Sequence, residues 1–300
     1  MNSSTPREAW QRAPALRTAL ARGELLVALQ PQVDLISGAT VGVEALARWH
    51  HAEHGQVSPA EFLPVAESTG LTGALHETVL DAALTHCGQW QSTAHPELGV
   101  SVNVSPRALA DDAFPSQVLN ALQNHRIQPK HLTLEVTETG SVRRDPRVTT
   151  NLQAIADAGV RVCLDDVGTG DASLLELNAL PVDEIKIDRL FVAGLPGNRV
   201  GEAIVAALAE LGRRLGARVV AEGVETEACK ARLIELGCHL GQGFLISRPL
   251  PPGEFLTWLN VHRAGGSGSA PVQRAADDLS RASAAAAAAA AALQRLSPSP

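Results

Sequence analysis

Short apolar runs alternate with longer segments of helical periodicity along most of the chain. Each run is rich in Val, Ile and Leu and has the length of a buried strand, whereas the intervening segments are long enough for helices. This pattern predicts eight strands, at Leu25–Val33, Thr40–Ala47, Gly99–Val104, Leu132–Val136, Arg161–Leu164, Glu184–Ile187, Arg218–Ala221 and Gly243–Ile246.

The segments between the later strands predict helices. In SPAEFLPVAEST, Ser58 has the properties of an N-cap, Pro59 suits the first helical position and Glu61 completes a capping box. The other predicted helices include Thr72–Gln91, Pro115–His125, Pro146–Asp157, Glu202–Leu215 and Glu227–Leu236.

The first two strands are separated only by DLISGA, which is too short for a helical crossover. We expect these two strands to pair as an antiparallel hairpin, whereas strands joined by helices pair in parallel. Eight strands with repeated βα units favour an α/β fold, a (β/α)8 TIM-like barrel with the first strand antiparallel to the others. An open doubly wound sheet has the same periodicity and is the alternative.

The composition changes near Ala264, after which GGSGSAPVQ, a polar stretch, an alanine run and SPSP follow. This composition is typical of a flexible linker and tail. We therefore expect a helical lead-in at residues 1–23, the barrel at residues 24–262 and a Gly-, Ser-, Ala- and Pro-rich tail at residues 263–300.

Overall composition excludes several classes of function. Hydrophobic residues make up 45% of the chain and charged residues 19%, which is typical of a globular protein with a large core. The net charge of −7 argues against a general DNA, RNA or membrane-surface binder, because such proteins need a basic face. The four cysteines lack close ligand spacing, and no signal peptide or apolar run of about 18 residues is present, so we expect buried thiols in a cytoplasmic protein.

Polar or acidic residues stand at the ends of most predicted strands, where an apolar core does not need them. The carboxyl ends of barrel strands meet at one mouth, where the active sites of such barrels lie. The sequence therefore predicts that several of these side chains share one pocket. In chain order they are Glu44, Asn103, Glu135, Glu138, Asp165, Asp166, Lys186, Asp188, Glu222, Glu225 and Gln242.

Five of these side chains are carboxylates that could not all ionise unaided in one pocket, namely Glu44, Glu135, Asp165, Asp166 and Glu222. Divalent cations would remove this conflict, and oxygen ligands without His or Cys favour Mg²⁺ or Mn²⁺ over Zn²⁺. Two adjacent aspartates allow one carboxylate to bridge two ions. The pattern thus indicates two divalent cations that activate water for phosphodiester cleavage.

Each motif taken alone also has a structural interpretation. Asp-Asp followed by Gly-Thr-Gly is commonly a turn with Asx hydrogen bonds. Lys186 and Asp188 lie two residues apart and could form an ion pair on one face of a strand. The functional interpretation therefore depends on polar groups occurring together at most strand ends.

In the same order, these segments resemble the EAL domain family of cyclic-di-GMP phosphodiesterases. The resemblance runs from about Leu25 to Trp258. It is carried by QPQVDLISGATVGVEALARW, FLPVAESTGL, SVNVSP, LEVTE, LDDVGTG, LPVDEIKIDRLFV, VVAEGVET and GCHLGQGFLISRPLP.

This resemblance implies a barrel with an antiparallel first strand and hydrolysis of cyclic-di-GMP to linear pGpG. The ligands it implies for a first metal are Glu44, Asn103, Glu135 and Asp165, and those for a second are Asp165, Asp166 and Glu222. The catalytic residues it implies are Lys186, which orients or deprotonates the attacking water, Gln242, which helps place that water, and the ligands Glu44 and Glu222.

The same resemblance implies residues that bind the substrate and residues that support the loop after the paired aspartates. Arg48 matches an arginine that contacts the substrate, and its planar fork suits a phosphate or a guanine edge. A surface ion pair or a cation–π contact with Trp49 would also explain Arg48. The implied substrate-binding residues are Gln30, Leu46, Arg48 and Pro249, and the implied loop-supporting residues are Glu138, Gly168, Thr169 and Gly170.

The chain departs from the family pattern in that loop, which reads DDVGTGDASL. Val167 replaces an aromatic residue, Asp171 a tyrosine and Ala172 a serine, and His239 stands where an acid is common. These changes put the turnover rate and the geometry of the homodimer expected from the family in doubt. A cyclic-di-GMP receptor with little turnover is therefore the alternative function, and a protein-interaction module without nucleotide is a third.

Overall fold

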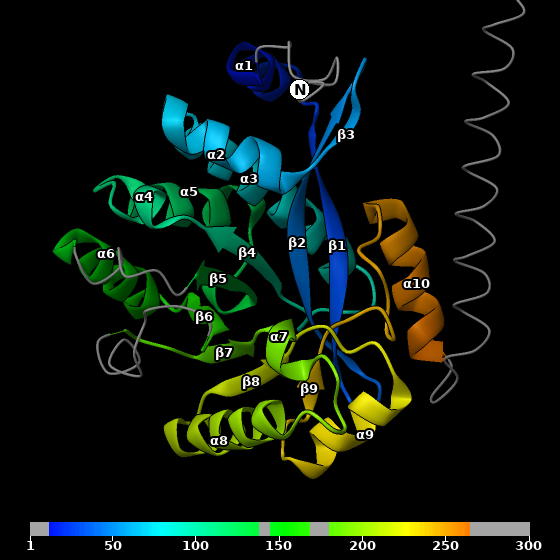
Figure 1. The fold of residues 1–300 in the computed structure, drawn as a ribbon. Helices are drawn as coiled ribbons and strands as arrows, with labels where there is room; N and C mark the ends of the chain where they lie inside the picture. Colours follow the sequence, from blue (N-terminus) through cyan, green and yellow to red (C-terminus); the bar gives the residue numbers. More distant parts are fainter. Residues whose placement is uncertain (1–11, 138–144, 169–179, 265–300) are drawn as a thin grey trace, which may run out of the picture.

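The computed structural model describes residues 12–137, 145–168 and 180–264 of the chain (Figure 1). The helices are α1 (Arg12–Arg22), α2 (Pro59–Thr69), α3 (Thr72–Gln91), α4 (Pro106–Leu109), α5 (Phe114–His125), the 3-10 helix η2 (Pro129–His131), α6 (Pro146–Asp157), α7 (Arg189–Val192), α8 (Arg199–Leu215), α9 (Glu227–Glu235) and α10 (Pro252–Ala264). The strands are β1 (Leu25–Asp34), β2 (Thr40–His51), β3 (Gly55–Val57), β4 (Val100–Val104), β5 (Leu132–Thr137), β6 (Arg161–Val167), β7 (Glu184–Ile187), β8 (Arg218–Ala221) and β9 (Leu240–Gly241).

Eight of these strands close into a barrel with helices around its outside (Figure 1). Strands β2 and β4 to β9 follow one another around the sheet with parallel pairing, and β1 closes it by pairing antiparallel with both β9 and β2. The predicted barrel with an antiparallel first strand is therefore confirmed, and the open sheet is excluded. The ninth strand, β3, pairs with the far end of β2 outside the closed ring.

Two local predictions were wrong, and one short strand was not predicted. The eighth barrel strand is Leu240–Gly241, whereas the predicted strand Gly243–Ile246 forms a turn in which Ile246 N–H donates to the Gly243 carbonyl at 3.0 Å. The chain turns there because Gly243 lies against the backbone of Val224, which leaves no room for a side chain. Ser58 is the N-cap residue of α2 and Pro59 begins the helix, as predicted, but the Ser58 side chain makes no capping hydrogen bond, so the predicted capping box does not form. The short strand β3 had no counterpart among the predicted strands.

The apolar core lies between the strands and the helices. Trp90 of α3 packs edge-on against Phe255 of α10, with ring centroids 5.5 Å apart, and both side chains are fully buried. Leu16 and Ala19 of α1, which lies within the expected lead-in, are also fully buried. All four cysteines are buried free thiols, as predicted. Within the described part of the chain, no helix is both long enough and apolar enough to cross a membrane.

Candidate metal and catalytic site

Lys186 occupies the centre of a buried acidic cluster inside the barrel. The lysine side chain is 1% exposed, and it projects from β7. Four carboxylates from other strands or strand ends surround its ammonium group. The Nζ atom lies 2.6 Å from Glu222 Oε1, 2.8 Å from Glu135 Oε2, 3.3 Å from Asp165 Oδ1 and 3.4 Å from Glu44 Oε2.

Parallel pairing explains why residues far apart in sequence meet here. Asn103 of β4 is the register partner of Glu135 of β5, and Thr137 of β5 is the partner of Asp165 of β6. Glu44 differs from its predicted position at a strand end, because β2 continues to His51 and extends beyond the ring. Glu44 therefore lies in the middle of β2 and still reaches the same pocket.

Three amide side chains hold Glu44 in place, directly or through one another. Asn103 Nδ2 donates to Glu44 Oε1 at 2.8 Å, and Gln242 Nε2 donates to Glu44 Oε2 at 2.5 Å. Gln242 Nε2 also lies 2.9 Å from Gln30 Oε1, and Gln30 Nε2 donates to the Ser247 carbonyl at 3.1 Å. The structure thus brings Gln30, Asn103 and Gln242 together around one carboxylate.

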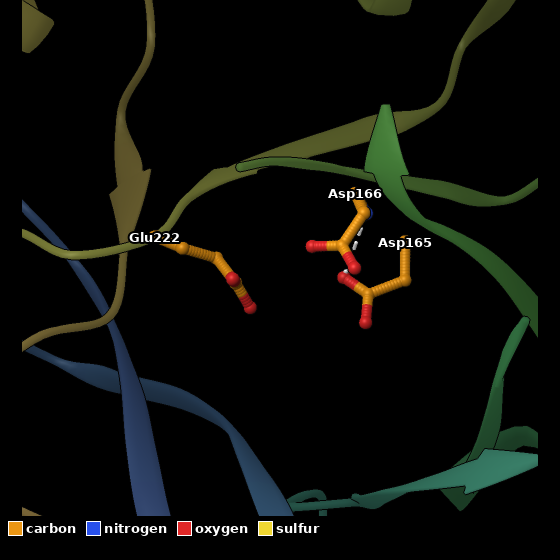
Figure 2. A group of neighbouring side chains, drawn as sticks. All are labelled: Asp165, Asp166 and Glu222. Atoms are coloured by element: carbon orange, nitrogen blue, oxygen red, sulfur yellow. Dashed lines mark hydrogen bonds between the residues drawn. The ribbon is translucent and has the colours of Figure 1, made fainter. Parts of the chain in front are cut away.

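Asp165, Asp166 and Glu222 form a second part of the cluster. Figure 2 shows their carboxylates pointing toward one another, with one ligand oxygen of each within 4.8 Å of the others. The backbone of Asp166 has a φ of 56°, in the left-handed region that non-glycine residues rarely adopt, and its N–H donates to Asp165 Oδ1 at 3.0 Å. This local conformation turns two consecutive aspartates of β6 toward the same space.

Burial alone would raise the pKa of both Glu44 and Glu135, but their surroundings separate them. The pKa of Glu44 lies below its ordinary value, because the Lys186 charge and the hydrogen bonds from Gln242 and Asn103 outweigh burial. The pKa of Glu135 lies well above its ordinary value, because burial and the charge of Glu44 outweigh Lys186. One ammonium group therefore does not balance both carboxylates.

The three acids of Figure 2 are also shifted upward. Burial raises the pKa of Asp165. Burial and the neighbouring Asp165 raise the pKa of Asp166 to about 7, and burial together with Glu44 and Asp165 raises that of Glu222 to about 7 although Lys186 opposes the shift. Such shifts mark carboxylates crowded together without enough positive charge.

The donor set fits divalent cations. Glu135 Oε1 is buried and has no hydrogen-bond partner among the described residues, so a carboxylate oxygen is available in the cluster. The other atoms of the cluster that could bind a metal are carboxylate and amide oxygens, which are the ligands that Mg²⁺ and Mn²⁺ prefer. The structure therefore contains an acidic cluster suited to metal binding, as the sequence predicts.

The other predicted site residues lie nearby or outside the described residues. Leu46 and Arg48 continue β2 beyond Glu44, and Arg48 Nη1 donates to the Ala47 carbonyl at 2.9 Å. Pro249 is half-buried and precedes Leu250, which pairs with Leu29 of β1. Glu138, Thr169 and Gly170, like the altered Asp171 and Ala172, lie outside the described residues.

Two further positions named from the sequence make specific local contacts. Gly168 has a φ of 98° and lies against the Phe191 ring, where a Cβ would be 3.0 Å from a ring carbon. Asp188 caps α7 by accepting a hydrogen bond from Leu190 N–H at 2.6 Å. Lys186 instead pairs with the acidic cluster, so the simple Lys186–Asp188 ion pair considered above is excluded.

A cavity of ≈700 Å³ next to the cluster was not predicted from the sequence. Its lining includes Leu46, Arg48 and Asn103, together with His76 of α3. His76 follows Leu75 and precedes Val79 on an apolar stripe, a pattern that indicates a core position. A histidine on such a stripe was the available signal, and it is a weak one.

Comparisons with known proteins agree on one family. A family model for the EAL domain matches residues 13–249. The bifunctional diguanylate cyclase/cyclic di-GMP phosphodiesterase MucR of Pseudomonas aeruginosa is 43% identical over 241 residues, which make up 80% of this chain and 35% of MucR. Cyclic di-GMP phosphodiesterase PA2567 of the same organism is 38% identical over 258 residues, 84% of this chain and 44% of that protein.

A solved structure described as "PaMucR Phosphodiesterase, c-di-GMP complex" is also similar, with a TM-score of 0.77 and 42% identity. The match covers 82% of this chain and 100% of that one. The chain spans less than half the length of the two curated relatives named above. With the family model matched over most of its length, the chain belongs to the EAL domain family.

Proposed function

We propose that this protein hydrolyses cyclic-di-GMP to linear pGpG and so lowers its cellular concentration. The observation that carries the proposal is the convergence of Glu44, Glu135, Asp165 and Glu222 on Lys186, beside Asp166. The relatives named as phosphodiesterases and the relative solved with c-di-GMP support the choice of substrate.

The acidic cluster would hold two divalent cations, Mg²⁺ or Mn²⁺. When bound, these ions supply Lewis-acid chemistry that lowers the pKa of a water and stabilises charge on the phosphate. We assign Glu44, Asn103, Glu135 and Asp165 to one ion, and Asp165, Asp166 and Glu222 to the other.

In the reaction, water attacks the phosphorus in line with the departing ester oxygen. A new P–O bond forms as the P–O3′ bond breaks; the attacking water gives up one proton and the released O3′ oxygen takes up one, which gives the linear product. Lys186 would orient the attacking water, because its buried ammonium group is a hydrogen-bond donor directed into the cluster. Gln242 would help to place the water, since its Nε2 contacts Glu44 and its Oε1 has no partner among the described residues.

The substrate would be held at the rim beside β2. Arg48 uses one N–H group on the Ala47 carbonyl, and its remaining donors suit a phosphate or a guanine edge. Leu46, Gln30 and Pro249 are the other proposed substrate contacts.

Incubation of the purified protein with cyclic-di-GMP tests the proposal. We expect pGpG in the presence of Mg²⁺ or Mn²⁺ and none in excess EDTA, as resolved by liquid chromatography. Binding without product would favour the receptor alternative, and absence of both would favour the interaction module.

Replacing Mg²⁺ by Ca²⁺ tests the role of the ions. Ca²⁺ prefers longer and looser coordination, so we expect cyclic-di-GMP to bind while turnover falls by about 10²-fold, the scale of a misplaced reacting group. Equal rates with the two ions would contradict a mechanism that depends on tight metal geometry.

A further inference from the structure

The short helix α7 contacts two segments that carry ligands of the proposed second ion. One segment follows Asp165 and Asp166 at the end of β6, and the other begins at Glu222 after β8. In the barrel, β7 separates these two strands, so no direct pairing sets the distance between their acids. The contacts of α7, which follows β7, therefore bear on how the three carboxylates meet.

The pairing between β6 and β7 skips the two aspartates. After Leu164, the register shifts, and β6 pairs with β7 again only at Val167, opposite Ile187. Asp165 and Asp166 occupy this irregularity, and irregularities of this kind redirect side chains near active sites. On the β7 side, the position of the two aspartates therefore depends on contacts other than strand pairing.

The ring of Phe191 in α7 supplies such a contact. Gly168, the second residue after Asp166, has a φ of 98° and lies against this ring. A Cβ on Gly168 would be 3.0 Å from Phe191 Cε2 and 3.2 Å from Cζ, so the ring packs directly on the glycine backbone. The position of the ring thus determines the path of the chain that leaves Asp166.

A second close contact joins α7 to the segment of Glu222. Glu222 N–H donates to the Ile187 carbonyl at 3.0 Å, and the next residue, Gly223, has a φ of 70°. A Cβ on Gly223 would lie 2.7 Å from Arg189 Cβ and 3.4 Å from Arg189 Cα. Only glycine permits this approach, which places the first residue of α7 against the backbone next to Glu222.

Neighbouring elements fix the position of α7 itself. Asp188 caps its first turn, and the carbonyl of the buried Val192 accepts a hydrogen bond from the Cys229 thiol of α9 at 3.7 Å. The carbonyl of Phe191 lies against Gly201 of α8 so closely that no Cβ would fit there. A displacement of α7 would therefore disturb its packing against both α8 and α9.

Mg²⁺ and Mn²⁺ sites depend on accurate spacing, because a functional site must hold its groups to within about 0.5 Å. We propose that α7 is a spacer that sets the distance between the paired aspartates and Glu222, whose carboxylates meet in Figure 2. Phe191 and Arg189 are its positioning residues, and they act through Gly168 and Gly223. The inference rests on the proposed function, because it requires that these three acids hold one of the two ions.

Phe191→Leu tests one side of the spacer. The smaller side chain loses the ring contact with Gly168, so we expect the Kd of one of the two Mn²⁺ ions to rise about 10-fold, as for other groups that support a metal ligand. Isothermal titration calorimetry without substrate measures this change. The Mn²⁺ concentration at half-maximal turnover should rise by the same factor, whereas excess Mn²⁺ should restore kcat and leave the KM for cyclic-di-GMP unchanged.

The matched control for this variant is Phe255→Leu. Phe255 is fully buried and packs on Trp90 in the core, away from the acidic cluster. The substitution should lower the melting temperature, because it removes buried apolar volume, but it should change neither the Kd for Mn²⁺ nor the activation by Mn²⁺.

Gly223→Ala tests the other side, with Gly216→Ala as its control. The two glycines have φ values of 70° and 71°, so an alanine at either position carries the same backbone strain. A Cβ on Gly216 meets nothing within 4 Å, whereas one on Gly223 meets Arg189. Both variants should lower the melting temperature, but only Gly223→Ala should raise the Kd of one Mn²⁺ ion, by about 10-fold or more.

The outcomes distinguish this inference from the proposed hydrolysis. If the wild type makes pGpG but Phe191→Leu and Gly223→Ala bind both Mn²⁺ ions as tightly as the wild type, α7 is no spacer and the hydrolysis stands. If the wild type binds Mn²⁺ without turnover, the hydrolysis fails, while the Kd values of the variants still decide the inference. Equal weakening of Mn²⁺ binding in the two control variants, or absence of Mn²⁺ binding by the wild type, overturns the inference.

Discussion

Strand β7 carries two buried charged side chains, Glu184 and Lys186, which lie two residues apart on the same face. Near the start of the strand, Glu184 Oε2 lies 3.2 Å from Arg218 Nε, so one carboxylate meets one guanidinium. Near its end, Lys186 meets four carboxylates. The first arrangement is balanced within the protein, whereas the second carries excess negative charge.

The comparison shows which buried charges the fold explains by itself. A buried carboxylate with its own partner needs no further ligand, although burial still raises the pKa of Glu184. Around Lys186, the pKa values of Asp165 and Glu222 are also raised, and Glu135 retains a buried oxygen that has no partner within the described part of the chain. The excess charge is at the mouth of the barrel, where ligands of such folds bind.

The largest effect is expected from Glu44→Ala. Loss of Glu44 removes a proposed metal ligand together with the acceptor of Asn103 and Gln242. We expect pGpG formation to fall by at least about 10³-fold, more than the 10- to 100-fold typical of groups that only support a ligand. Unchanged turnover in this variant would remove Glu44 from the proposed metal site. Glu184→Gln, at the Glu184–Arg218 pair near the start of β7, serves as the control, and the turnover of the folded variant should stay within about tenfold of the wild type.

Lys186→Met and Arg218→Met compare the stability of the charge arrangements at the two ends of β7 directly. Each removes the cation from a buried charge arrangement, which costs about 3–5 kcal/mol of unfolding free energy when no substitute exists. Mg²⁺ should restore much of the loss in Lys186→Met, because it can replace the missing positive charge, but not in Arg218→Met. Urea unfolding in EDTA and in Mg²⁺ measures the unfolding free energy of both variants. If Mg²⁺ stabilised the two variants equally, the excess negative charge would not be specific to the surroundings of Lys186.

The sequence predicted the barrel because most of its strands are regular. β1, β4, β5, β7 and β8 each contain several Val, Ile or Leu residues, and a single short loop determined the antiparallel hairpin. By contrast, β9 has only two residues and β3 only three, too few for any periodicity to appear. The turn at Gly243 arises from close contact with the backbone of Val224, which is distant in sequence.

For the candidate site, the grouping of the acidic residues was predictable from the sequence, but their individual contacts were not. Acids at parallel strand ends must converge, so their grouping follows from the fold alone. The central place of Lys186 depends on side-chain reach across the barrel, and the partner of Asp188 depends on the helix that follows it. His76 was not distinguishable from a core residue, because only the fold shows that its buried Nε2 atom has no hydrogen-bond partner among the described residues.

A smaller effect is expected from Gln242→Leu. Its amide bridges Gln30 and Glu44, so the variant keeps the carboxylates but loosens one of them. Turnover should fall by about 10- to 100-fold, the usual range for a residue that supports a ligand. The affinity for Mg²⁺, measured from the activation curve, should weaken with it. A fall in kcat with unchanged Mg²⁺ activation would instead assign Gln242 to the water alone.

The smallest effect is a pH dependence of stability that Mg²⁺ should reverse. The pKa of Asp166 and that of Glu222 are about 7 in the folded protein, against ordinary values of 3.8 and 4.5. In EDTA the folded form therefore retains protons that the unfolded chain releases, so this contribution to stability is present below about pH 4 and is lost as the pH rises through about 7. Mg²⁺ binds the ionised carboxylates and should make the protein more stable at pH 8 than at pH 5.5.

Melting temperatures at these two pH values, in EDTA and in Mg²⁺, measure the effect; a shift of a few degrees corresponds to about 1 kcal/mol in a domain of this size. Asp166→Asn should reduce the slope in EDTA, since it removes one titrating group, whereas the same slope in both buffers would show that the cluster binds no cation.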